Sequence, residues 1–289
     1  MKIGVIAELL RRPSVLESID YAAELGIAGV QFFAGHHGNG ADFTKITDAE
    51  LQQIRERCAQ RKLTISAVCG DICGKSFQVP HEAPVRVAVS RLVLEKTARL
   101  GCRVMTTHIG CIPDNINDPV YPVMVTHVRE AAEYAASLGI TFAIETGPEL
   151  ADVLRRFIED VDSRGLGVNL DPANLRGVSA EDPVYAVQRL APYIVHTHAK
   201  DAINTHIGSS GAFYKMRNLD GSLRTYSARP AGFQEVPLGQ GQVDWDAYLD
   251  ALKEIGYDGF LTVERECGDD PVADIKTAIG FLKGKLANR

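Results

Sequence analysis

The stretch AASLGITFAIE at residues 135–145 shows the pattern that decides the fold: an amphipathic helix ends, a glycine follows, and an apolar strand begins. The pattern returns in AAELGIAGVQFF, ARLGCRVMTTH, DSRGLGVNLD and LKEIGYDGFLTVE, at residues 22–33, 98–108, 162–171 and 252–264. Glycine lacks a Cβ and is the usual residue in the left-handed conformation that ends helices, which we expect at Gly26, Gly101, Gly139, Gly165 and Gly256. The near-continuous apolar strands are typical of a parallel sheet buried on both faces, so the repeats predict βα units.

The whole chain is predicted to be a single (β/α)8 TIM barrel, one domain over residues 1–289. Strands are expected near residues 3–8, 28–33, 63–69, 102–108, 140–146, 167–171, 193–199 and 259–264. Helix starts are marked by a cap at Ser14, a capping box from Thr47 to Glu50, and the pairs Asp182-Pro183 and Asp270-Pro271. The rival is a doubly wound open sheet, which is disfavoured because no glycine-rich phosphate loop follows the first strand.

Composition and charge exclude several classes of partner. Of the 289 residues, 45% are hydrophobic and 24% are charged, which is the balance of a soluble globular protein. No apolar run reaches the roughly 20 residues that span a bilayer, and residues 1–14 resemble a first strand, so we expect a cytoplasmic protein without a membrane partner. The net charge of −6 argues against a nucleic-acid partner.

The cysteines are expected to be reduced thiols. They are scattered through a large domain, unlike the framework of a small secreted fold. Cys69 and Cys73 lack the second pair that a structural zinc site would need.

A long βα loop, an insertion at about 202–242, follows the seventh expected strand. Such loops are uncommon in compact domains, and this one should emerge on the face where TIM barrels carry their active sites. Its basic residues outnumber its acidic ones: Lys215, Arg217, Arg224 and Arg229 against Asp220 and Glu235. A substrate lid that favours anions, an arm that packs on a neighbouring subunit and an ordinary surface loop all fit.

Four consecutive expected strands end in a metal-ligand residue. These residues are Glu145 in FAIE, Asp171 in VNLD, His198 in IVHTHAKD and Glu264 in LTVE. Inward-pointing side chains on neighbouring strand ends converge, and carboxylates that end buried strands are costly unless they are paired or bind a metal. The pattern therefore predicts a divalent metal site.

Each of these residues also has an ordinary interpretation. Asp171 could cap the short turn PANL, and Glu264 could belong to a surface ion pair in VEREC. His196 shares a face with His198 and is expected to be a hydrogen-bonded neighbour deeper in the barrel. His108, which ends the fourth strand, should face the site with a hydrogen-bonding role.

Five segments occur in an order that resembles the xylose isomerase-like barrel family of sugar (phosphate) isomerases and epimerases. They are ETG at 145–147, LDPAN at 170–174, HTHAKD at 196–201, PLGQGQVDW at 237–245 and GYDGFLTVE at 256–264. The family includes tagatose and psicose 3-epimerases, inosose dehydratase and, more remotely, endonuclease IV. The resemblance covers essentially the whole chain and is specific to the superfamily, not to one substrate.

The resemblance implies that Glu145, Asp171, His198 and Glu264 hold one divalent cation and that the two glutamates act as acid and base. It also implies a homo-oligomer, a dimer or tetramer. The chain departs from the epimerases in carrying Asn174 where they have a histidine three residues after the metal aspartate. The long insertion before Pro237 is a second departure.

Three carboxylates and one imidazole suit Mn, Mg or Co, with Zn possible. Such an ion can chelate a sugar carbonyl and the adjacent hydroxyl, so that a glutamate can form an enediolate by removing the proton α to the carbonyl. Returning the proton isomerises or epimerises a carbohydrate substrate, with His108, Asn174 and Lys200 as candidate substrate-binding residues. Loss of a β-hydroxyl would make the protein a keto-sugar or inosose dehydratase, and a 3-keto-glycoside lyase would use the same step. An endonuclease IV-type nuclease is disfavoured, since it needs three metals and more histidines. Cys69 and Asp71 stand at the end of the third expected strand, where such a nuclease would need a histidine to bind metal.

Overall fold

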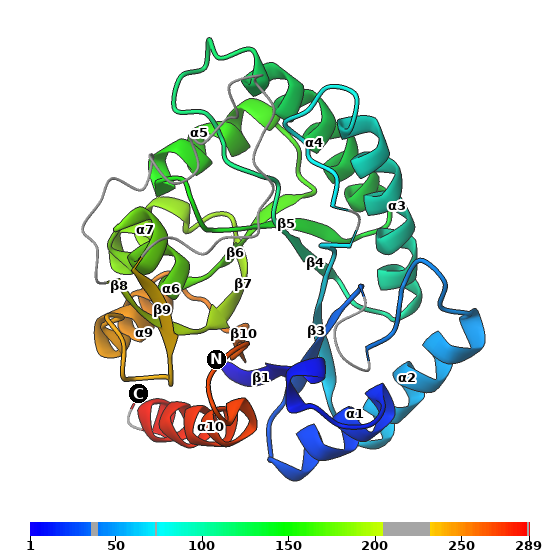
Figure 1. The fold of residues 1–289 in the computed structure, drawn as a ribbon, viewed down its shortest axis with the longest axis vertical. Coiled ribbons are helices and arrows are strands. Elements are labelled where there is room, and N and C mark those ends of the chain that lie inside the picture. The colour runs from blue at the N-terminus through cyan, green and yellow to red at the C-terminus, as the bar shows by residue number, and fades with distance from the viewer. Residues whose placement is uncertain (36–39, 73, 205–231, 288) are drawn as a thin grey trace.

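The computed structural model describes residues 1–35, 40–72, 74–204, 232–287 and 289. Within these residues, eight parallel strands close into a barrel in the order β1-β10-β7-β6-β5-β4-β3-β2, and the helices surround it (Figure 1). The barrel strands are β1 Lys2–Ile6, β2 Gly29–Phe33, β3 Thr64–Cys69, β4 Val104–Thr107, β5 Thr141–Glu145, β6 Leu166–Leu170, β7 Ile194–Ala199 and β10 Phe260–Val263. The predicted TIM barrel is confirmed, and the open sheet is excluded because β1 pairs with both β2 and β10.

Helices connect successive strands along the chain. They are α1 Val15–Glu24, α2 Asp48–Gln60, α3 Ala83–Arg99, α4 Val120–Ser137, α5 Ala151–Val161, α6 Pro172–Asn174, α7 Pro183–Leu190, α9 Trp245–Glu254 and α10 Pro271–Ala287. There are also two short helical turns among the described residues: η1 Ala7–Leu10 follows β1, and η2 Leu175–Ser179 follows α6. None of the described helices is long and apolar enough to cross a membrane.

The predicted helix caps are confirmed. The Ser14 side chain accepts a hydrogen bond from the Glu17 amide, and Thr47 and Glu50 form the reciprocal capping box of α2. Asp182 caps α7, whose first residue is Pro183. Asp270 accepts from the Ala273 amide at the start of α10. These side chains satisfy amides that have no partner within the first helical turn.

The predicted left-handed conformation is confirmed at four of the five glycines, and the prediction is wrong for the fifth. Gly26, Gly101, Gly139 and Gly256 have φ between 65° and 76°. Gly165 does not have a positive φ, because α5 already ends at Asp162, whose φ is 51°. A Cβ on Gly165 would overlap the carbonyl oxygen of Ala132 in α4, so glycine is needed there for a close approach of two backbones.

The insertion begins and ends in a hairpin that the sequence did not predict. β8 (Asp201–Asn204) pairs antiparallel with β9 (Phe233–Val236), beside the barrel. Residues 205–231, with Lys215, Arg217, Arg224 and Arg229, lie outside the described residues, so the lid and the subunit arm both stay predictions.

The buried Asp201 carboxylate fastens the turn after the hairpin. It accepts hydrogen bonds from the amides of Gly239, Gly241 and Val243 and from the Trp245 indole. The segment PLGQGQVDW is therefore a turn that leads into α9, as its resemblance implied.

The described cysteines are free thiols, in agreement with the sequence. Cys58, Cys102 and Cys69 are buried, and Cys73 lies outside the described residues. The main core fills the space between strands and helices, while Ile6, Phe33 and Cys69 form a small separate cluster.

Candidate metal centre and active site

The barrel brings the four predicted metal ligands together. One donor atom from each of Glu145, Asp171, His198 and Glu264 lies within 4.8 Å of the others, and all four residues are buried. Nδ1 of His198 is 3.4 Å from a Glu145 oxygen, 3.6 Å from Asp171 Oδ2 and 3.2 Å from Glu264 Oε2. In the part of the chain that the structure describes, this is the single such cluster.

The convergence follows from the strand order. β5, β6, β7 and β10 are consecutive neighbours in the barrel. Glu145 is the last residue of β5 and His198 lies in β7, while Asp171 and Glu264 come directly after β6 and β10. Because parallel strands end on the same face of the barrel, ligands at these ends reach one point.

Asp171 caps a helical turn with one carboxylate oxygen and leaves the other for a metal ion, so the two alternatives from the sequence are compatible. Its Oδ1 accepts hydrogen bonds from the amides of Ala173 and Asn174, at 2.8 and 2.9 Å, and so caps the α6 turn. Its Oδ2 is fully buried, faces His198, and has no hydrogen-bond partner among the described residues. A buried carboxylate oxygen without a partner is costly, and a divalent cation would remove that cost. The residues present therefore fit a metal ion.

His198 is oriented by a residue on the far side of its ring. Its Nε2 lies 3.2 Å from Oε1 of Gln31, on β2, while Nδ1 faces the carboxylates. An amide oxygen can only accept, so this contact places a hydrogen on Nε2, and Nδ1 is the ring nitrogen that would bind a metal ion. Burial lowers the pKa of His198, but the charges of Glu264 and Glu145 outweigh burial and hold that pKa well above its usual value.

His196 is the hydrogen-bonded neighbour that the sequence predicted. Its Nδ1 contacts Asn169 Oδ1 at 2.8 Å, and its Nε2 contacts Thr262 Oγ1 at 2.9 Å. Burial and the nearby His198 hold the pKa of His196 well below its usual range, so this ring is neutral.

Glu264 is held by a buried lysine. Lys200 Nζ lies 3.0 Å from Glu264 Oε2, 3.4 Å from Glu266 and 3.8 Å from Glu235 on β9. Burial raises the pKa of Glu264, but the charges of Lys200 and His198 outweigh it, so the pKa stays well below its usual value. Glu264 is thus part of a buried charge network, not the surface pair that was the alternative.

Glu145 is hydrogen-bonded from two directions. Asn169 Nδ2 donates to its Oε2 at 3.1 Å, and Asn174 Nδ2 donates to its Oε1 at 3.3 Å. On another side, Nε2 of His108 lies 3.6 Å from Glu145 Oε1. Glu145 therefore has a fixed orientation within the cluster.

The predicted substrate-binding residues all lie at the cluster. His108 and Asn174 are beside Glu145, and Lys200 is beside Glu264. The contacts of Asn174 and Lys200 with the glutamates support the ligands directly. Contact with a substrate stays a prediction for all three.

Four polar residues behind the ligands were not identified from the sequence. Gln31 and Asn169, both fully buried, orient His198 and Glu145, while Asp71 and Arg86 lie behind His108. The signal for two of them was visible: a glutamine inside GVQFF and an asparagine inside LGVNL are polar residues within apolar strands. Asp71 and Arg86 carry no such local signal.

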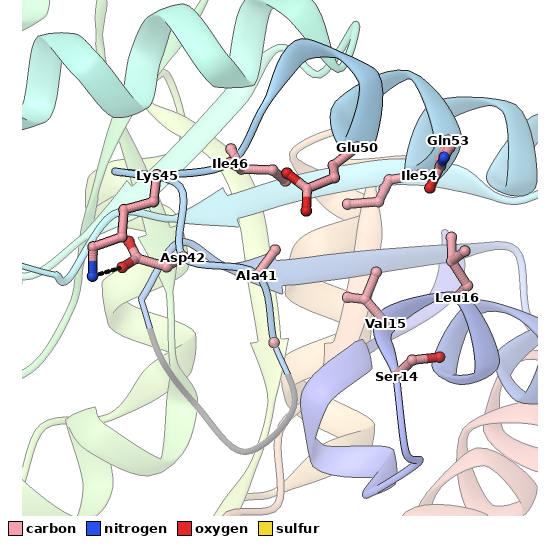
Figure 2. A pocket seen from close by; sticks show the side chains of 11 residues that line it. Ser14, Val15, Leu16, Ala41, Asp42, Lys45, Ile46, Glu50, Gln53 and Ile54 are labelled. Carbon is pink, nitrogen blue, oxygen red and sulfur yellow. Dashed lines mark ion pairs between the residues drawn. The ribbon is translucent and has the colours of Figure 1, made fainter.

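A cavity of about 430 Å³ lies away from this cluster, between the N-terminal parts of α1 and α2 (Figure 2). Its charged side chains already have partners within its lining or the adjacent helix. Asp42 pairs with Lys45 at 3.1 Å, and Glu50 belongs to the α2 capping box. The chemistry of the ligand cluster makes the barrel face, not this cavity, the candidate active site.

The model of the xylose isomerase-like TIM barrel family matches residues 19–285. An uncharacterized protein of Methanocaldococcus jannaschii is 27% identical over 254 residues, 83% of this chain and 77% of that protein. A shorter match, 34% identical over 68 residues, links 23% of this chain to 24% of the L-ribulose-5-phosphate 3-epimerase UlaE of Escherichia coli.

Solved structures resemble the chain along nearly its whole length. A xylose isomerase domain protein from Planctomyces limnophilus has a TM-score of 0.76 and 27% identity, with 98% of this chain and 95% of that chain covered. A D-tagatose 3-epimerase-like protein has a TM-score of 0.72 and 20% identity, with 99% and 100% covered. The probable 3-DHS dehydratase AsbF of Bacillus anthracis has a TM-score of 0.74 and 19% identity, with 98% and 99% covered. The last two show a shared fold.

Proposed function

Since the chain belongs to the xylose isomerase-like TIM barrel family, we propose that it is a divalent-metal-dependent sugar isomerase or epimerase that transfers a proton α to a carbonyl. The observation that carries this proposal is the buried cluster of Glu145, Asp171, His198 and Glu264. The match to UlaE, a sugar-phosphate 3-epimerase, supports it over part of the chain.

Glu145, Asp171, His198 and Glu264 would hold the metal ion. Three carboxylates and one imidazole favour Mn, Mg or Co, with Zn possible. When bound, the ion supplies a positive charge that polarises a substrate carbonyl and makes its α-hydrogen more acidic.

The two glutamates provide the acid and the base. Glu145 and Glu264 come from β5 and β10, which are separated in the barrel by β6 and β7. They therefore approach the site from different directions. One carboxylate removes the proton from the carbon next to the carbonyl, which leaves an enediolate. The other returns a proton from its own side, so that the carbon is inverted.

The surrounding residues hold these carboxylates in place. Asn174 and Asn169 donate to Glu145, and Lys200 contacts Glu264. A substrate oxygen that enters beside either glutamate meets His108, Asn174 or Lys200, which are the groups that we propose bind it.

Hydrogen–deuterium exchange tests the proposal. The protein is stripped with a chelator, reloaded with Mn²⁺ or Mg²⁺, and incubated in D₂O with ketoses, ketose phosphates, keto-inositols and 3-keto-glycosides. We expect metal-dependent deuterium incorporation, seen by NMR, at a carbon next to a carbonyl. An epimer or isomer as product supports the proposal, whereas an eliminated product assigns the dehydratase or lyase reaction that shares the first step.

Matched variants assign the acid and the base. Glu145→Gln and Glu264→Gln should each nearly abolish exchange, while Cys69→Ser should retain it. Exchange at the wild-type rate in either glutamine variant would overturn the acid–base assignment. Absence of exchange across the panel with metal bound would overturn the proposed reaction.

A further inference from the structure

Behind His108 lies a partly buried group of polar residues to which the proposed reaction gives no role. Asp71 follows β3, Thr107 ends β4, and Arg86 lies on α3 with 3% of its surface exposed. A buried arginine is costly unless it is fully paired. This one connects an outer helix to the strand end that carries His108.

The Asp71 carboxylate is the centre of the group. Its Oδ1 accepts hydrogen bonds from Thr107 Oγ1 at 2.6 Å, from Arg86 Nη2 at 3.0 Å and from the His108 amide at 3.0 Å. Its Oδ2 lies 2.7 Å from Nδ1 of the His108 ring. Arg86 also donates to Thr107 Oγ1 at 2.6 Å. Asp71 is therefore fixed by the His108 amide and by the side chains of Thr107, Arg86 and His108.

These contacts define the orientation of the His108 ring. An ionised carboxylate can only accept, so the hydrogen of the contact with Asp71 is on Nδ1. Nε2 then points to the metal cluster, 3.6 Å from Glu145 Oε1. The His108 side chain is 38% exposed, in contrast with the 3% of Glu145, so a small molecule that reaches Glu145 also reaches this ring.

We propose that Asp71 is a positioning residue of the active site, which fixes the orientation of the His108 ring so that Nε2 meets a substrate oxygen beside Glu145. The inference rests on the proposed function for the identity of the substrate. It adds a carboxylate–imidazole pair, in which Asp71 acts only through His108. The oxygen that His108 contacts is the carbonyl or hydroxyl oxygen next to the carbon from which the proton is taken.

The position of the pair indicates which part of the substrate it recognises. Glu145 is both a proposed metal ligand and one of the two proposed acid–base groups, so an oxygen beside it is close to the reacting carbon. His108 should therefore affect turnover more than the binding of distant parts of the sugar. A displacement of about 1 Å at a reacting group can cost on the order of 100-fold in rate.

Two measurements test the inference, and the first needs no substrate. Protein labelled with ¹⁵N in its histidine rings is compared with Asp71→Asn by NMR, and the signals of His108 are assigned from their loss in His108→Gln. We expect the wild-type ring to carry its hydrogen on Nδ1. In Asp71→Asn the His108 signals should move, while those of His196 and His198 should stay. Unchanged His108 signals would overturn the positioning role.

The second measurement uses the compound with the fastest deuterium exchange in the panel above. Asp71→Asn should lower kcat on the order of 100-fold with little change in KM, and Mn²⁺ affinity, followed by electron paramagnetic resonance, should stay at the wild-type value. The double variant with His108→Gln should be no slower than His108→Gln alone, because the two residues act as one unit. If the double variant lost kcat by the product of the two single losses, the inference would be overturned.

Ser66→Ala is the control for loss of a buried hydrogen bond in the same region. Ser66 lies in β3 and donates to the Val30 carbonyl at 3.1 Å, away from His108. The kcat of the Ser66→Ala variant should match that of the wild type. A loss of kcat as large as that of Asp71→Asn would show a general effect of disturbing β3 and would overturn the specific role of Asp71. If no compound in the panel exchanges, the proposed function fails, and the ring signals still decide whether Asp71 positions His108.

Discussion

Glu8, in the short turn η1 that follows β1, should make the protein less stable as pH rises. Its side chain is 8% exposed, and neither carboxylate oxygen has a hydrogen-bond partner among the described residues. Burial disfavours the charged form and raises the pKa of Glu8 from 4.5 to about 8. Between these values the folded protein keeps a proton that the unfolded chain has lost. Unfolding therefore releases a proton, and the free energy of unfolding falls as pH rises through this range.

The size of the effect follows from the size of the shift. At about 1.4 kcal/mol per pKa unit, a rise from 4.5 to about 8 corresponds to about 5 kcal/mol of stability lost above pH 8. Local relaxation that admits water to the carboxylate would reduce this loss, so we expect about 3 to 5 kcal/mol. Glu8→Gln has no charge to bury and should not show this loss.

Urea unfolding at about pH 5 and about pH 9 measures the difference, with a chelator present so that metal binding does not contribute. Between these conditions the wild type should lose about 3 kcal/mol or more relative to Glu8→Gln. The exposed Glu24, at the end of α1, gives the matched control, because Glu24→Gln should follow the wild type at both pH values. An equal pH dependence of the wild type and Glu8→Gln would refute the reasoning.

Three further changes test the site and the fold. Asp171→Asn replaces a buried carboxylate of the cluster by a neutral amide, so Mn²⁺ binding measured by calorimetry should weaken by at least about tenfold; unchanged affinity would contradict its role as a ligand. Gly165→Ala puts a Cβ against the Ala132 carbonyl oxygen and should lower the free energy of unfolding by about 1 to 3 kcal/mol, a loss that urea unfolding would detect. Glu235→Gln removes the charge of one of the two carboxylates that pair with Arg265, 2.9 Å away, and should cost about 3 kcal/mol in the same assay, whereas a wild-type midpoint would show that the pair with Asp274 is sufficient.

The barrel and the buried cluster of candidate metal ligands could be predicted because their signals are local and repeated. The βα units repeat an apolar strand and an amphipathic helix, several of these helices carry a cap, and neighbouring strand ends share one face of a barrel. Ligand residues at four such ends, Glu145, Asp171, His198 and Glu264, therefore had to converge once the strand order was right. The structure then adds the distances between them, which no strand pattern contains.

The residues behind the ligands could not be predicted in the same way. Gln31 contacts His198 across 167 positions of the sequence, and Asp71 meets His108 across 37. Such contacts depend on side-chain directions across the barrel, not on any local pattern. At Gly165 a local signal led to a wrong prediction. A glycine near a helix end usually indicates a left-handed cap, but Gly165 is required because its backbone packs closely against another helix.

Asn174 stands where the epimerases that the sequence resembles are expected to carry a histidine. Its contacts show what an asparagine does at this position. An asparagine amide at this position donates to Glu145 Oε1 at 3.3 Å and to the Thr146 carbonyl at 3.2 Å, so it fixes the glutamate without offering an ionisable group. The imidazole beside Glu145 comes instead from His108, after β4, and is held there by Asp71. The site thus has an imidazole next to this glutamate that comes from the end of β4. Under the proposed function, a substrate oxygen that contacts His108 lies on the β4 side of Glu145.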